Sequence, residues 1–143
     1  MSKTYITQAL RRLVESRAHG QCEYCLLPSE LAFMLPHEVD HVIAVKHGGA
    51  THENNLALTC WRCNRYKGSD LTSFDPLTGA LTPLFNPRLA SWITHFGLVE
   101  ARIEGKTAEG RTTIQLLRLN APDRLVERQR LIMFGRFPMP SQD

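Results

Sequence analysis

Four cysteines in two closely spaced pairs constrain the fold of this chain more than any other feature. They form the motifs Cys22-x-x-Cys25 and Cys60-x-x-Cys63, with 34 residues between the motifs and no cysteine left over. A gap of two residues lets both thiolates of a motif bind one ion, and two motifs complete the closed sulfur shell of structural zinc. Two disulfides, or buried thiols without a metal, are the alternatives. We expect a tetrathiolate zinc site that stabilises the fold and leaves no open coordination position for chemistry.

The composition is that of a globular protein. The chain has 143 residues, enough for one ordinary domain, and 43% of them are apolar and 22% charged. It contains no run of eighteen apolar residues, and scattered charges replace the apolar stretch of a secretion signal at its N-terminus. We therefore expect a cytoplasmic protein without a membrane span. A reducing cytoplasm disfavours the disulfide alternative.

The hydrophobic pattern of the first half predicts a helix, a hairpin and a short helix. An amphipathic helix is expected over residues 5–18, ended by Gly20. Strands over residues 37–45 and 54–59 follow, joined by a long loop that contains paired glycines. A short helix is expected to begin at Asn64. The hairpin is the foldable insertion that the wide gap between the cysteine motifs requires.

The second half has a different texture. It begins with turn-rich sequence that predicts an irregular strap over the core. One strand is expected over residues 98–104, and two helices over residues 112–119 and 123–134. The predicted apolar face of the last helix comprises Leu125, Val126, Ile132 and Met133. The whole pattern is that of an α+β fold.

Polar residues suited to metal-assisted hydrolysis lie between and just after the cysteine motifs. Asp40 and His41 are adjacent in the first predicted strand, Asn55 opens the return strand, and Asn64 follows the last cysteine. An imidazole can act as a base near neutral pH, because its ordinary pKa is about 6.5. Carboxylate and amide oxygens suit Mg²⁺, which takes further oxygens from water and phosphate. A lone histidine on such a strand face would more often be a core residue, but its polar company favours catalysis.

This stretch resembles the zinc-bearing branch of the HNH endonuclease family. The similarity runs over residues 39–51 and 55–68, framed by both cysteine motifs. The family's ββα-metal (His-Me finger) site is a hairpin and a helix around one divalent ion. The resemblance implies such a core, held by the four-cysteine structural zinc, with flanking helices. The implied segments are an N-terminal helix (1–21), the core (22–70), and a C-terminal strap with helices (71–143).

The resemblance also implies a role for each polar residue. His41 would be the general base, and Asn55 would fix the hairpin loop that orients it. Asp40 and Asn64 would bind the catalytic Mg²⁺ or Mn²⁺; the family often has histidine at the position of Asn64 but also uses asparagine. The implied function is metal-dependent hydrolysis of phosphodiester bonds in DNA. The alternatives are a zinc-stapled DNA-binding module without cleavage, or an interaction domain of a larger phage or defence assembly.

Basic residues near the core and in the last third of the chain are candidate DNA contacts, with a solvated surface as the alternative. They are Arg62, Arg65, Lys67, Arg118, Arg124 and Arg128. Two further histidines, His37 and His47, could touch phosphate or metal, although support of the local backbone is the favoured interpretation. Neighbouring strand residues point to opposite faces, so Asp40 and His41 can share one site only at a strand end or a kink.

Overall fold

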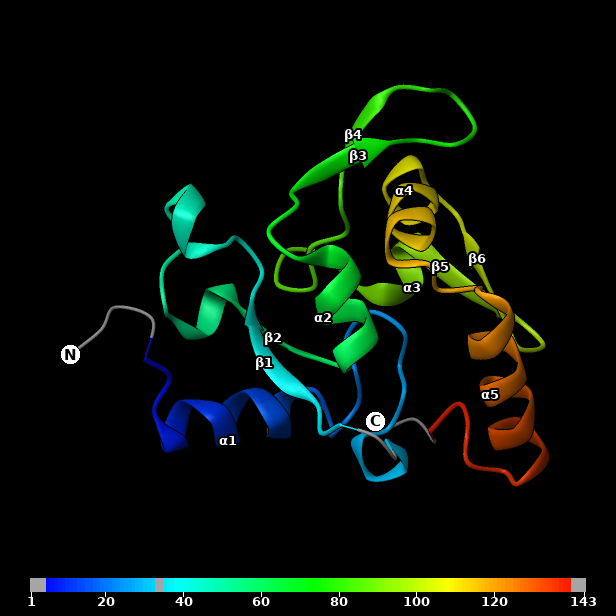
Figure 1. The fold of residues 1–143 in the computed structure, drawn as a ribbon, viewed down its shortest axis with the longest axis horizontal. Helices are drawn as coiled ribbons and strands as arrows, with labels where there is room; N and C mark the ends of the chain where they lie inside the picture. The colour runs from blue at the N-terminus through cyan, green and yellow to red at the C-terminus, as the bar shows by residue number, and fades with distance from the viewer. Residues whose placement is uncertain (1–4, 33–34, 140–143) are drawn as a thin grey trace.

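A computed structural model describes residues 5–32 and 35–139 (Figure 1). Residues 1–4 of the predicted N-terminal helix segment and residues 140–143 of the predicted C-terminal segment lie outside the described residues. The helices are α1 (Gln8–Arg17), α2 (Trp61–Lys67), α3 (Trp92–His95), α4 (Ala108–Leu117) and α5 (Pro122–Met133). The strands are β1 (Glu38–His41), β2 (Leu56–Thr59), β3 (Thr72–Phe74), β4 (Leu81–Pro83), β5 (Phe96–Val99) and β6 (Arg102–Gly105). They pair as three antiparallel hairpins, β1–β2, β3–β4 and β5–β6.

The first helix forms where the sequence predicts it and packs on the first hairpin. The side chain of Thr7 caps α1 by accepting a hydrogen bond from the Leu10 amide at 3.2 Å, and Gly20 follows the helix with a φ of +68°. Val14 is fully buried and belongs to one apolar cluster with Leu56 of β2. The helices α1 and α2 lie on opposite sides of the β1–β2 hairpin (Figure 1). The hairpin therefore lies between two helices.

The predicted hairpin exists, but its strands are shorter than expected. β1 ends at His41, and the chain then leaves the sheet through a 3₁₀ turn at Val45–His47. A second 3₁₀ turn at Glu53–Asn55 leads into β2, which pairs in register with Val39 opposite Leu58 and His41 opposite Leu56. The short helix that was expected to begin at Asn64 begins one turn earlier, at Trp61 inside the second cysteine motif, because Cys60 caps it.

The cysteine motifs lie inside the main apolar core. One buried cluster contains all four cysteines together with aromatic and aliphatic side chains from distant segments. These are Tyr24, Leu27, Phe85, Phe96, Ile103, Leu117 and Leu119. The rings of Phe85 and Phe96 meet edge to face, with their centroids 5.1 Å apart. The segments after residue 70 therefore pack directly against the cysteine motifs.

The strap and the following strand contain more regular structure than the sequence suggests. The predicted single strand over residues 98–104 is wrong, because the chain turns at Glu100, which adopts a φ of +55°, and makes the hairpin β5–β6. The strap contains the β3–β4 hairpin, which projects beyond α4 at the top of Figure 1. Arg111 of α4 holds its turn through two hydrogen bonds to the buried Asp75 carboxylate, at 3.0 and 2.8 Å.

The last helix exists but buries a different face from the one predicted. α5 leaves Met133 and Val126 of the expected apolar face 82% and 43% exposed, whereas Arg124 and Arg128 are only 2% and 3% exposed. Pro122 opens the helix, as proline does when its missing N–H is not needed. Two arginines pointing into a core require buried partners.

Candidate functional site

The four cysteines form a compact cluster of free thiols. All four are buried, and their Sγ atoms lie within 4.8 Å of one another. A tetrahedral ion with Zn–S bonds of about 2.3 Å separates its sulfurs by about 3.8 Å. The Sγ atoms of Cys25 and Cys60 are 3.6 Å apart, so the cluster fits a structural zinc ion with little rearrangement. The expected four-cysteine arrangement is thus present, and the disulfide alternative is not.

Backbone amides favour the thiolate form of these sulfurs, whereas burial opposes it. The Cys25 amide points at Cys22 Sγ at 3.5 Å, and the Cys63 amide at Cys60 Sγ at 3.4 Å. Burial raises the pKa of the Cys22 and Cys63 thiols, whereas hydrogen bonds from the neighbouring thiols, Cys22 first, lower the pKa of Cys25. The thiols therefore do not all ionise by themselves. Metal binding releases the remaining protons.

Arg124 and Arg128 do not face solvent, which overturns their prediction as DNA contacts. Arg124 Nη2 donates to Cys63 Sγ at 3.1 Å, and its Nη1 donates to the Leu117 carbonyl at 3.0 Å. Arg128 donates through Nε to the Ala101 carbonyl at 2.7 Å. Burial alone would lower the pKa of Arg124, but the cysteine sulfurs beside it more than offset this and raise the pKa above its ordinary value. Both side chains belong to the core.

Arg62 and Lys67 both have partners within the protein. Arg62 Nη1 bonds Glu127 of α5 at 3.1 Å, but its side chain stays 21% exposed, so its role as a DNA contact stays a prediction. Lys67 is 2% exposed, and its Nζ lies 3.2 Å from both Asp40 Oδ2 and the His41 carbonyl oxygen. It cannot reach a DNA backbone from there. Sequence reasoning missed the pair with Asp40, although both residues lie within the motif.

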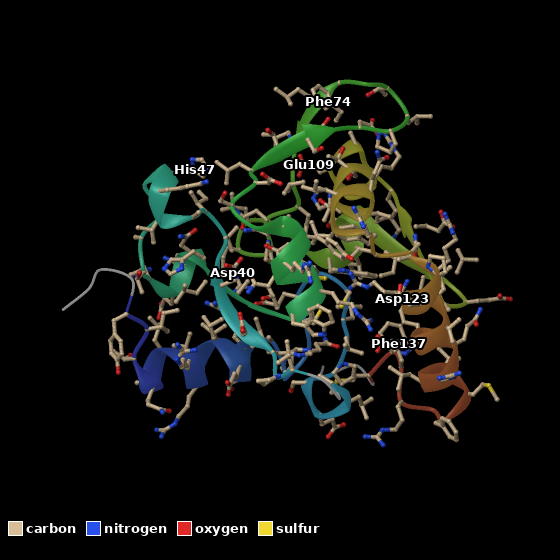
Figure 2. The ribbon with its side chains drawn as sticks, viewed as in Figure 1. Asp40, His47, Phe74, Glu109, Asp123 and Phe137 are labelled. Carbon is tan, nitrogen blue, oxygen red and sulfur yellow. The ribbon has the colours of Figure 1, made fainter. Side chains whose placement is uncertain are left out.

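The side of β1 that faces α2 carries two carboxylates. Asp40 meets Lys67, and Glu38, two residues earlier on the same strand face, accepts a hydrogen bond from Asn64 Nδ2 at 2.7 Å. Asn64 and Lys67 are three residues apart, so they lie on one face of α2. Figure 2 labels Asp40 near the end of β1, beside α2. Burial raises the pKa of Asp40, while the charge of Lys67 opposes that shift.

The structure therefore brings the two predicted metal ligands, Asp40 and Asn64, to facing elements. It also adds Glu38, which sequence reasoning missed. The alternation of strand residues was the signal that could have revealed Glu38, because residues two apart in a strand share a face.

His41 is the last residue of β1 and lies on the strand face opposite Asp40. Its Nε2 is 2.8 Å from the hydroxyl of Thr51, a residue in the loop that sequence reasoning left without a role. Asn55 holds that loop: its Nδ2 donates to the carbonyls of Ile43 and Ala50, each at 2.9 Å, and its Oδ1 accepts from the Ile43 amide at 2.9 Å. The loop carrying Thr51 is thus tied to the strand end carrying His41.

Gly49 is required where this loop closes. A Cβ at this position would lie 1.7 Å from the Ile43 carbonyl oxygen and 2.8 Å from Asn55 Nδ2. Any side chain would displace the Asn55 clasp. The paired glycines therefore serve the geometry of the loop beside His41.

The other two histidines have backbone partners. His37 Nε2 lies 2.7 Å from the Leu27 carbonyl oxygen, and His47 Nε2 lies 3.1 Å from that of Ser69. Figure 2 places His47 on the outer turn, well away from Asp40. Both contacts fit the favoured interpretation that these histidines support the local backbone.

Two of the predicted DNA contacts remain on the surface. Arg65 is exposed on α2, and Arg118 is exposed at the end of α4, where its guanidinium lies 4.7 Å from the ring centroid of Tyr66. A pocket of about 390 Å³ opens near the same end of α2. Its lining includes Val42, Lys67, Asp70, Leu71, Leu84 and Leu89. The surface beside the hairpin and helix is therefore hollowed and largely apolar.

Comparisons with known proteins identify a family domain in the first half of the chain. Residues 22–70 match the family model described as HNH endonuclease. The chain is 30% identical over 138 residues to the Septu protein PtuB of Bacillus thuringiensis, in an alignment that covers 91% of this chain and 47% of the relative. The chain thus spans about half the length of that curated relative. No solved structure matches the chain. Within the part of the chain that the structure describes, no helix has the length and apolarity to cross a membrane.

Proposed function

We propose, from the HNH endonuclease domain that residues 22–70 of this chain form, that the protein hydrolyses phosphodiester bonds in DNA with the help of one divalent cation. The observation that carries this proposal is the arrangement around β1. Asp40 faces Asn64's helix, while the neighbouring His41 is held at the strand end by a separate loop. In this proposal β1, β2 and α2 form the ββα unit, and the two cysteine motifs that flank the hairpin hold it through the structural zinc.

His41 is the general base in this proposal. If its Nε2–H donates to Thr51 Oγ1, the lone pair of the imidazole is on Nδ1, which can accept a proton from the attacking water. Asn55 acts as a positioning residue, because it anchors the loop that carries Thr51. The rigid loop keeps the ring orientation constant between turnovers.

Asp40 and Asn64 are the proposed ligands of the catalytic Mg²⁺ or Mn²⁺. Asn64 uses its amide nitrogen to bond Glu38, and this orients its amide oxygen independently of the metal. Lys67 holds Asp40 Oδ2 in the same way. Two protein oxygens leave room for water and phosphate oxygens, as Mg²⁺ sites usually require. When bound, the cation neutralises charge on the phosphate and on the leaving oxygen.

The placement of Asp40 and His41 on opposite strand faces agrees with a site that wraps around the strand end. β1 stops at His41, so the proposed metal ligand and the proposed base are the last two residues of the strand. A phosphodiester at this end would meet the cation on one side and the imidazole on the other. Arg65 and Arg118, which remain exposed, are the proposed contacts for the DNA backbone.

The test is the conversion of supercoiled plasmid to nicked or linear DNA. Cleavage is expected with Mg²⁺ or Mn²⁺, and none after both ions are chelated under conditions in which zinc stays bound. The amount of bound zinc is measured on the same sample. A protein that shifts the plasmid on a gel, retains its zinc and leaves the DNA uncut with every divalent cation would instead be the DNA-binding module.

A further inference from the structure

Arg124 contacts the sulfur cluster from a helix that is distant in the sequence. It comes from α5, more than sixty residues after Cys60, yet its Nη2 lies 3.1 Å from Cys63 Sγ and 3.9 Å from Cys60 Sγ. The second terminal nitrogen of the guanidinium, Nη1, donates to the Leu117 carbonyl at 3.0 Å, and only 2% of the residue is exposed. The guanidinium is therefore clamped between the sulfur cluster and the end of α4.

Charge explains why an arginine belongs at this position. Four thiolates around one zinc ion carry a net charge of −2, and every one of these cysteines is buried. A buried charge without a partner destabilises the folded state. The amides of Cys25 and Cys63 donate to the sulfurs but bring no formal charge. Arg124 brings a full positive charge and an N–H donor to the same sulfurs.

Arg128 provides an internal comparison one turn further along α5. It is equally buried, at 3% exposed, but its side-chain hydrogen bonds go to oxygens, including the Ala101 carbonyl and Asn120 Oδ1. No sulfur is among the hydrogen-bond partners that the structure gives for it. The two arginines share a helix and a degree of burial, and they differ in whether they contact the cysteines.

We propose that Arg124 is the outer partner of the zinc–thiolate centre, which neutralises part of its charge and makes α5 a component of the metal site. Partners of metal ligands orient those ligands and tune their affinity for the metal. A second contact ties the same two helices together, because Arg62, beside Cys63 on α2, bonds Glu127 of α5. Zinc binding and the docking of α5 are then one event.

The experiment compares Arg124→Gln with Arg128→Gln in the full chain, and uses the exposed Arg130→Gln as the surface control. Zinc affinity is measured by competition with a chromophoric chelator. Loss of a partner of a metal ligand typically weakens metal affinity by about 10–100-fold. We expect a loss in that range for Arg124→Gln, and less than threefold for the other two. An equal loss in Arg124→Gln and Arg128→Gln would overturn the proposal, as would wild-type affinity in Arg124→Gln.

A spectroscopic measurement separates contact with the sulfurs from general stability. The Co²⁺-loaded protein has thiolate-to-metal charge-transfer bands, whose energy depends on hydrogen bonds to sulfur. We expect these bands to shift in Arg124→Lys, which keeps the charge but not the fork that reaches both Leu117 and Cys63. Bands of wild-type energy in the folded, cobalt-loaded Arg124→Lys protein would overturn the proposal even if Arg124→Gln fails to fold.

Discussion

The sulfur cluster and the proposed catalytic site both take a residue from α2, but they are built in opposite ways. Cys60, which caps α2, and Cys63 are buried, and protein groups surround their sulfurs, Arg124 among them. Asn64, the residue directly after Cys63, and the facing Asp40 of β1 are only partly buried. A closed shell suits an ion that stays, whereas an ion that activates water and phosphate needs open positions.

Each of the two sites has a positively charged partner, and the two partners differ in what they contact. Arg124 faces sulfurs that together need a divalent ion, and we propose that it completes that centre. Lys67 forms an ion pair with Asp40, so that carboxylate is held in place before any divalent ion arrives. The comparison teaches that neighbouring residues of one helix can belong to a closed cluster and to a partly open site. The following predictions test whether the two sites have separate roles.

The largest effect is expected from breaking the closed centre. Cys60→Ser removes a zinc ligand but leaves a hydroxyl oxygen that can still cap α2, so its effect reports on the metal site. Structural zinc contributes roughly 10–16 kcal/mol in zinc-finger peptides, which is comparable to the whole stability of a small domain. We expect the variant to lose zinc and to unfold, as measured by metal analysis and circular dichroism. A folded, zinc-free Cys60→Ser protein would show that the cluster is not what holds the fold.

A smaller and different effect is expected from the proposed catalytic metal site. Asp40→Ala and Asn64→Ala should keep zinc and fold but weaken the proposed catalytic metal site, so that DNA cleavage falls at low Mg²⁺. Part of the loss should return as Mg²⁺ or Mn²⁺ is raised, because mass action refills a weakened site. Cleavage is measured across a metal titration. Full cleavage by both variants at low Mg²⁺ would remove these residues from the metal site.

The Asp75–Arg111 pair lies outside both centres and should respond to pH without involving zinc. The hydrogen bonds from Arg111 hold the pKa of Asp75 well below its ordinary value, assisted by the Leu77 amide and the Thr78 hydroxyl. A depressed carboxylate pKa stabilises the folded state above the unfolded value of about 3.9, and this contribution is lost as pH falls below it.

Asp75→Asn should therefore be less stable than wild type at neutral pH, with the difference shrinking below about pH 4. Urea midpoints of both proteins, each with its zinc content recorded, give the comparison. A difference that stays constant with pH would mean that the charge of Asp75 contributes nothing.

The smallest effect is expected at the surface. Arg65→Gln and Arg118→Gln should weaken binding to all DNA sequences alike, and the salt slope should fall by about 0.9 for each phosphate contact that a substitution removes. The exposed Arg130 is the matched control, since it lies on α5 and is not among the proposed DNA contacts. Filter binding over a range of salt concentrations measures the slope. A salt slope that does not change would mean that neither arginine contacts DNA.

The cysteine motifs and the hairpin between them could be predicted better than the second half of the chain, for a physical reason. Two cysteine motifs specify ligand type and spacing, so the cluster and the hairpin between its halves could be predicted from the sequence alone. The last helix was assigned the wrong buried face, because apolar periodicity assumes that arginines point outward. Arg124 and Arg128 point inward because they donate hydrogen bonds to a buried sulfur and a buried carbonyl oxygen. Those partners are distant in sequence.

Local turns and side-chain pairs could not be predicted either, because they depend on contacts that the linear sequence does not show. The turn at Glu100 carries no glycine or proline, so a hairpin looked like one strand. Lys67 lies in a basic stretch and was predicted to touch DNA, but its partner Asp40 is 27 residues earlier in the chain. The roles of Thr51 and Glu38 depend on pairing across the loop and across β1, which a linear sequence does not display.

The central claim is that His41 is the base and that the zinc cluster is not part of the chemistry. The most direct measurement is single-turnover cleavage of plasmid DNA by His41→Ala at saturating Mg²⁺, with zinc content and DNA affinity determined on the same preparation. His47→Ala is the matched control, because His47 lies in the same loop region but bonds the Ser69 carbonyl. We predict that His41→Ala cleaves at least about 10²-fold more slowly at every Mg²⁺ concentration, with zinc and DNA binding unchanged. Cleavage by His41→Ala at the wild-type rate, with its zinc in place, would contradict the assignment.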